Sequence, residues 1–98
     1  MTRQVSLLVN DQSIELDYFV QGFIDHTIGG ILAGLKSTGK IKSADLFIEG
    51  DRVTINLNED KIPTNPFVSE IVRNTIVGMV SSLKGVGKVD RVNITIKR

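Results

Sequence analysis

The chain has 98 residues, with 12 Lys or Arg, 11 Asp or Glu, one His and no Cys, which gives a formal net charge of +1. That length suffices for one hydrophobic core and not for two independent ones, and a hydrophobic content of 41% excludes a disordered tail. The absence of cysteine excludes disulfides, thiolate nucleophiles and Cys-based metal sites, while the near-zero charge argues against a surface that binds polyanions as a whole.

An internal repeat organises the chain. Residues 5–50 align with residues 53–98 without a gap when the sequence is shifted by 48 positions, and 13 of the 46 aligned pairs are identical. Unrelated sequences would share about three identities over that length. The chain is therefore predicted to be a single domain over residues 1–98, made of the two repeats 5–50 and 53–98.

Within each repeat the elements follow in the same order. Alternating apolar residues predict strands over residues 5–9 and 53–57, each followed by a polar turn. Whether residues 12–16 and 60–64 form short extra strands is left open. Asp17 and Asn65 are expected to cap helices whose apolar spacing runs over residues 19–35 and 67–83. Pro66 is expected in the first helical position, and Gly39 and Gly87, just beyond Lys36 and Lys84, are expected to stop the helices. Strands over residues 44–48 and 92–96 close the repeats.

The order of elements is therefore βαβ followed by βαβ, joined by a tight hairpin at residues 49–52. Two split βαβ units joined in this way resemble the ferredoxin-like sandwich, an α+β fold. The resemblance covers nearly the whole chain and implies a four-stranded antiparallel sheet of order 4-1-3-2 with both helices on one face. It concerns architecture alone and implies no function.

The outward face of the predicted sheet is the first candidate surface. If the apolar strand positions face the helices, the other face carries short, mostly uncharged side chains together with two large apolar ones. Such a face is a candidate self-association surface, and a homodimer is the expected state. Its candidate residues are Leu8, Phe47, Thr54, Asn56, Asn93 and Thr95.

Small residues on the helices form a second candidate. The four glycines of the first helix each cost about 1 kcal/mol relative to alanine, so something must offset them. Small residues recur every four positions along a ridge made of His26, Gly30 and Gly34 in the first helix and of Asn74, Gly78 and Ser82 in the second. This spacing predicts either packing between the helices, or an exposed ridge that serves self-association or a small-ligand groove. Packed ridges would make Gly30→Leu and Gly78→Leu each cost more than about 2 kcal/mol.

Lysines at the helix ends are candidate anion contacts, namely Lys36, Lys40, Lys84 and Lys88. Residues 34–40 match the first positions of a phosphate-binding P-loop, but they end a helix instead of opening one, so no nucleotide site is expected. The two lysine clusters are predicted at opposite ends of the sheet, and the central strands lack aromatic residues that would stack bases. Nucleic-acid binding is therefore not favoured.

The sequence shows no set of residues with the spacing of a catalytic or metal site. His26 is the single histidine, and its sequence neighbour Asp25 lies on another helical face, so no catalytic residue, cofactor or metal site is assigned. No apolar stretch reaches the ~20 residues of a membrane span, which favours a cytoplasmic protein. The expected function is a non-catalytic module that self-associates through the open sheet face. Alternatives are a small-ligand regulatory or carrier module and a nucleic-acid-binding domain that uses the helix-end lysines.

Overall fold

The computed structural model describes residues 4–36, 41–83 and 85–97. In chain order the elements are β1 (Gln4–Val9), β2 (Gln12–Ser13), α1 (Tyr18–Lys36), β3 (Ser43–Glu49), β4 (Arg52–Leu57), β5 (Asp60–Ile62), α2 (Pro66–Ser81) and β6 (Arg91–Lys97). The bounds of β1 and β3 recur in β4 and β6 at the 48-residue offset of the sequence repeat.

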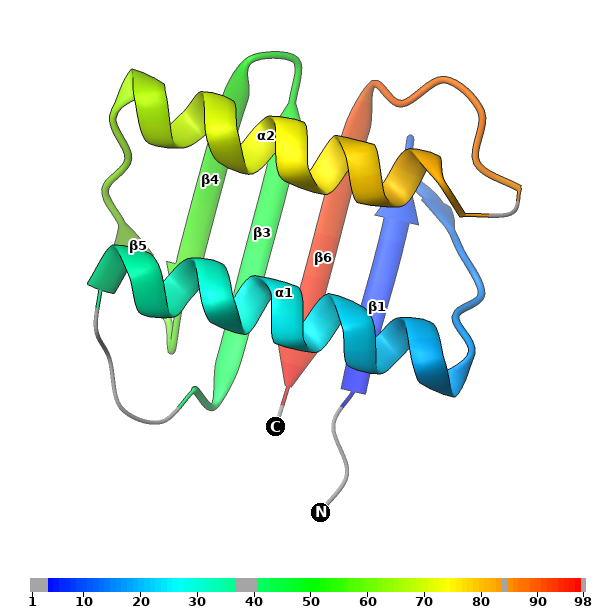
Figure 1. The fold of residues 1–98 in the computed structure, drawn as a ribbon, viewed down its shortest axis with the longest axis horizontal. Coiled ribbons are helices and arrows are strands. Elements are labelled where there is room, and N and C mark those ends of the chain that lie inside the picture. Colours follow the sequence, from blue (N-terminus) through cyan, green and yellow to red (C-terminus); the bar gives the residue numbers. More distant parts are fainter. Residues whose placement is uncertain (1–3, 37–40, 84, 98) are drawn as a thin grey trace.

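Two layers make up the molecule. Both helices cover the same face of one sheet and run across its strands in opposite directions (Figure 1). Alternate strand side chains face the helices, as in β3, where Ala44, Leu46 and Ile48 are buried. The helices contribute a buried row each to the same core, namely Ile24, Ile28 and Leu32 from α1 and Val72, Ile76 and Val80 from α2. The predicted α+β class is confirmed.

The predicted strand number and order are wrong. Within the described residues the sheet has six strands, in the order β2-β1-β6-β3-β4-β5, and is not the four-stranded ferredoxin-like sheet. Neighbouring strands are antiparallel throughout. Among the four long strands β6 and β3 are central, whereas the ferredoxin-like order would place β1 and β4 there.

Two short hairpins account for this difference. β1 bonds to β2 along one edge, and β4 is bonded on both edges, by β3 and by β5. A strand has only two hydrogen-bonding edges. β1 and β4 therefore cannot be neighbours, as the ferredoxin-like order requires. The C-terminal strand β6 lies beside β1 instead and also pairs with β3.

The hairpins turn on pairs of residues with positive φ. Asn10 and Asp11 have φ values of 51° and 66° between β1 and β2, and Asn58 and Glu59 have values of 50° and 72° between β4 and β5. Positive φ at both central positions is typical of a type I′ turn, whose twist matches that of the strands. The question left open for residues 12–16 and 60–64 is thus answered by β2 and β5, which are two and three residues long.

Replacing Glu59 by glycine is expected to stabilise the fold by about 1 kcal/mol, because a residue with a Cβ adopts this left-handed conformation at a cost that glycine avoids. Glu59 is exposed and lies at a φ of 72°. Urea denaturation of the dilute protein measures the effect. Glu59→Ala, which keeps the Cβ, serves as the control. Equal stabilities of the two variants would contradict the expectation.

The helix starts are as predicted. The Asp17 carboxylate accepts a hydrogen bond from the Val20 amide at 2.8 Å, and the Asn65 side chain accepts one from the Val68 amide at 2.8 Å. Pro66 follows Asn65 as the first residue of α2. The predicted stop of the first helix, Gly39, lies outside the described residues. The predicted stop of α2, Gly87, is wrong, because the glycine that adopts the left-handed conformation after α2 is Gly85, with a φ of 81°.

Candidate functional site

Large apolar side chains stand exposed on the helices. Phe19 is 73% exposed on α1 and Phe67 is 70% exposed on α2, and these two positions are equivalent in the sequence repeat. The full set is Tyr18, Phe19, Phe23, Phe67 and Ile71. The rings of Phe19 and Phe23 lie 6.1 Å apart between centroids. We call the surface made by the outward sides of α1 and α2 the helical face.

The exposure follows from the width of the apolar stripe on each helix. In α1, adjacent pairs such as Phe19–Val20 and Phe23–Ile24 repeat every four residues. A flat sheet buries only the side of a helix that faces it, so Ile24 is fully buried while Phe23 stays half-exposed. The apolar stripe of α1 is therefore wider than the side of the helix that the sheet covers, and its outer part is exposed.

The small-residue ridge also lies on the helical face. All six of its residues are exposed: His26, Gly30, Gly34, Asn74, Gly78 and Ser82. A Cβ added at Gly30, Gly34 or Gly78 would meet no atom within 4 Å. The prediction that these glycines pack the two helices of one chain against each other is therefore wrong. The ridge faces solvent, and it is the opposite side of each helix that packs against the sheet. The overpacking cost predicted for Gly30→Leu and Gly78→Leu is therefore not expected, because a Cβ at either position points into open space.

Charged side chains are scarce on this face. Between Tyr18 and Leu35 the one carboxylate, Asp25, is buried at 3% exposure. In α2 the charged residues are Glu70 and Arg73, and Arg73 pairs with Asp51 at 3.9 Å between the guanidinium and the carboxylate. Solvated helix faces normally carry many Lys and Glu side chains. The helical face is thus apolar or small over most of its area.

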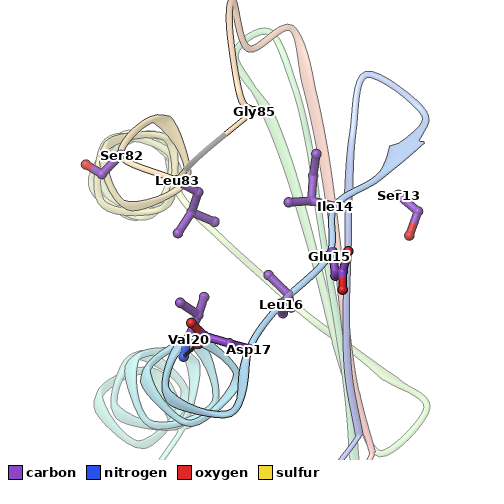
Figure 2. A pocket seen from close by; sticks show the side chains of 9 residues that line it. All are labelled: Ser13, Ile14, Glu15, Leu16, Asp17, Val20, Ser82, Leu83 and Gly85. Carbon is purple, nitrogen blue, oxygen red and sulfur yellow. Dashed lines mark hydrogen bonds between the residues drawn. The ribbon is translucent and has the colours of Figure 1, made fainter.

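Two cavities open at the end of the helix layer where α1 begins and α2 ends. One, of about 620 Å³, lies between the β2–α1 connection and the end of α2, with Val20, Leu16 and Leu83 turned toward its centre (Figure 2). Its polar groups do not converge, since the Asp17 carboxylate caps α1 and the Ser82 hydroxyl donates to the Gly78 carbonyl at 3.1 Å. The other, of about 310 Å³, is lined mainly by apolar side chains, among them Phe19, Phe23, Met79 and Leu83. Neither cavity offers the placed polar groups that orient a small ligand.

The six residues expected on the open sheet face lie on the side of the sheet opposite the helices, although the strands that carry them follow a different order from the predicted one. Strand register places Leu8, Asn93, Phe47 and Thr54 in one row across the sheet, and Thr95 and Asn56 in the next row on either side of Asp45. The Thr95 hydroxyl lies 2.9 Å from the Asp45 carboxylate, to which it donates. Leu8, at 39% exposure, is the one large hydrophobic residue of this face that is clearly exposed among the described residues. This face is therefore more polar than the helical face.

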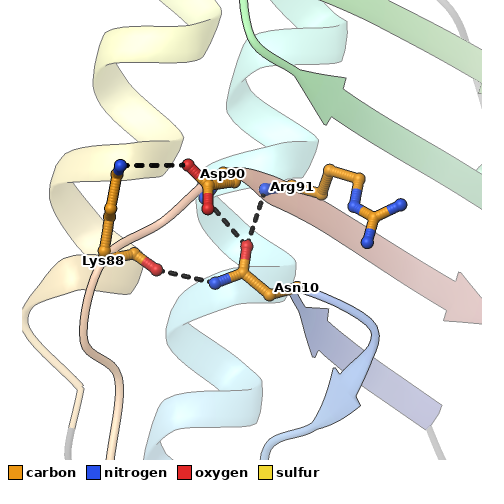
Figure 3. Close-up of polar contacts among 4 residues, drawn as sticks. All are labelled: Asn10, Lys88, Asp90 and Arg91. Atoms are coloured by element: carbon orange, nitrogen blue, oxygen red, sulfur yellow. Dashed lines mark hydrogen bonds and ion pairs between the residues drawn. The ribbon is translucent and has the colours of Figure 1, made fainter.

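The helix-end lysines are only partly described. Lys40, Lys84 and the side chain of Lys36 lie outside the described residues. Lys88 is exposed, and its ammonium lies 4.0 Å from the Asp90 carboxylate (Figure 3). An exposed pair of this kind contributes at most about 1 kcal/mol. The described residues therefore give no support to a basic surface for nucleic acid.

Asn10 holds the segment around Lys88 in place. Its amide nitrogen donates to the Lys88 carbonyl at 2.7 Å, and its amide oxygen accepts from the backbone N–H groups of Asp90 and Arg91 at 2.8 and 2.9 Å (Figure 3). Arg91 also pairs with Asp11. In the other repeat, the Asn58 oxygen accepts from the amides of residues 42 and 43 at 2.7 and 3.0 Å. Each asparagine thus joins its hairpin turn to the helix-to-strand connection of the other repeat.

Within residues 4–36, 41–83 and 85–97, the geometry brings no side chains together as a catalytic or metal site. His26 is exposed on the helical face. The described residues contain no group of three or more His, Asp or Glu side chains placed to hold a metal ion. In that same part of the chain, no helix combines the length and the hydropathy that a bilayer span requires.

Comparison with protein-family models, curated proteins and solved structures gave no match.

The exposed large apolar residues of the helices are the feature that sequence patterns missed. Phe19, Phe23, Phe67 and Ile71 all fit the helical spacing of core residues. The doubled apolar positions along each helix were the signal that could have found these side chains, because a single sheet can bury only one side of a helix.

Proposed function

We propose that this chain is a small, non-catalytic interaction module that self-associates through its helical face, with the cytoplasm as its expected compartment. The observation that carries the proposal is the exposure of Phe19 and Phe67 at equivalent positions of α1 and α2, on a face with few charges. Burying a side chain of this size yields about 1.5–3 kcal/mol. Monomeric soluble proteins rarely leave several such side chains exposed together.

The helical face supports this function better than the open sheet face does. On the sheet, Asp45 and Thr95 bond to each other, and Leu8 is less exposed than any of the five large apolar residues of the helices. Desolvating the sheet face would bury a carboxylate, which is costly unless it gains a partner. The helical face carries no comparable cost over its glycine and phenylalanine positions.

Sedimentation equilibrium of matched glutamate variants tests the proposal. Phe67→Glu places a charge on the helical face, and Thr54→Glu places the same charge on the open sheet face. Phe67→Glu is expected to weaken the dimer about 100-fold or more, because an unpaired carboxylate would be buried in the contact. Glutamate in the first turn of a helix favours the helix dipole, so the monomer should stay folded, as circular dichroism would show.

Thr54→Glu is expected to leave the dissociation constant within about threefold of the wild-type value, a free-energy change below ~0.7 kcal/mol. Two outcomes would overturn the proposal. One is a wild-type chain that stays monomeric, and the other is a dimer that Thr54→Glu dissociates while Phe67→Glu does not.

A further inference from the structure

Bulky and small residues follow each other in the same order along both helices. Each helix begins with two bulky apolar residues four positions apart and continues with two small residues four positions apart. In α1 these are Phe19 and Phe23, then Gly30 and Gly34; in α2 they are Phe67 and Ile71, then Gly78 and Ser82. All eight residues are exposed. Each helix therefore presents a raised half and a low half to solvent.

The antiparallel course of the helices sets these halves in a diagonal pattern. The first half of α1 lies beside the end of α2, as the cavity lined by Phe23 and Met79 shows, and the start of α2 lies beside the end of α1 (Figure 1). The raised halves thus occupy two opposite corners of the helical face, and the low halves occupy the other two.

On the basis of the proposed self-association, we infer that two copies stack helical face against helical face about a two-fold axis parallel to the sheets. Such an axis can run along the helices or across them. In both cases the rotation brings each raised corner of one copy over a low corner of the other. The surface is therefore complementary to itself, as an isologous contact requires.

Residue spacing fits this arrangement in detail. Consider α1 of one copy facing α1 of the other in the antiparallel direction. Phe19 and Phe23 are four residues apart, as are Gly34 and Gly30, so Phe19 lies over Gly34 of the partner and Phe23 over Gly30. Both rings then lie over positions without a side chain. Small residues at a helix contact allow the interaxial distance to fall toward ~8 Å. The glycines, which lower the stability of α1, gain a function as the sites that receive the partner's aromatic rings.

The area of the face is large enough for a stable dimer. The molecule measures 35 × 34 × 18 Å, and the helical face is one of its two broad sides. A stable contact buries about 800 Å² on each partner. A side of 35 × 34 Å has room for a contact of this size, so a second copy can cover the exposed aromatic residues.

Thiol cross-linking between single-cysteine variants tests the arrangement, and the cysteine-free chain makes the test specific. Phe23→Cys protein is mixed with Gly30→Cys protein, and separately with Gly78→Cys protein, at a concentration where sedimentation shows the dimer. An axis across the helices brings position 23 to position 30 of the partner, and an axis along the helices brings it to position 78. One of the two mixtures is expected to form the mixed disulfide about tenfold faster than Phe23→Cys forms its own homodimer.

Thr54→Cys on the open sheet face is the matched control and should cross-link slowly. The inference is overturned if Phe23→Cys links to itself fastest, which would place raised half on raised half, or if Thr54→Cys links fastest. Fast linking of Phe23→Cys to itself would leave the proposed self-association through the helical face intact, whereas fastest linking of Thr54→Cys would place the contact on the sheet and overturn that proposal as well. A wild-type chain that stays monomeric would remove the proposed function and the inference together.

Discussion

Replacing Ile94 by alanine is expected to lower the free energy of unfolding by about 3–4 kcal/mol, because a cavity remains where the side chain was. Ile94 is fully buried in β6 and pairs with Leu7 of β1 on one side and with Leu46 of β3 on the other. Its central place follows from the observed strand order. Urea denaturation monitored by circular dichroism measures the loss.

The same chemical change at Ile71 is the control for Ile94→Ala. Ile71 is 51% exposed on α2, so Ile71→Ala should cost the dilute monomer less than about 1 kcal/mol. It should weaken self-association, because Ile71 belongs to the helical face. Equal losses of monomer stability at the two positions would contradict the assignment of β6 to the centre of the sheet.

Replacing Asn10 by glycine is expected to cost about 2–3 kcal/mol of unfolding free energy. Glycine tolerates the φ of 51° at this position, so the variant isolates the loss of the three side-chain hydrogen bonds to residues 88, 90 and 91. Each such bond contributes about 1 kcal/mol. Thermal or urea denaturation of the dilute protein measures the change.

Asn10→Asp separates the two roles of the Asn10 side chain. An aspartate keeps an oxygen that accepts from the amides of Asp90 and Arg91 and loses the donor to the Lys88 carbonyl. It should therefore cost less than Asn10→Gly, at about 1 kcal/mol. If Asn10→Gly unfolds at the same urea concentration as the wild-type protein, Asn10 does not hold the two repeats together as described.

Strand faces were predictable from sequence, and the order of the strands was not. In β4, the alternation of Val53, Ile55 and Leu57 with Thr54 and Asn56 is enough to show which side of the strand is buried. The order of the strands depends on which strand edges are already hydrogen-bonded. β2 occupies one edge of β1 and β5 occupies one edge of β4, so these two short strands decide the order. A strand of two residues, Gln12 and Ser13, has no periodicity that a pattern could reveal. Its evidence lies in the Asn10–Asp11 turn, where φ is positive at both residues.

The candidate surface was only partly predictable for a similar reason. The sequence shows the glycine ridge and the doubled apolar positions, but hydrophobic spacing does not tell which partner covers a side chain. Phe23 and Ile24 are adjacent and both apolar, and only the placement of α1 on the sheet buries one and exposes the other. Likewise, Gly30 fits a helix contact in sequence, and the structure shows that the contact is not with α2 of the same chain.

The mass of the wild-type chain in solution tests self-association most directly. Light scattering at about 100 μM, a concentration well above the dissociation constant of a stable dimer, should give twice the 10.8 kDa of one chain, and dilution should return the single-chain value. A mass of one chain at the highest concentration would show that the helical face remains uncovered by a second copy, and would contradict the proposed function.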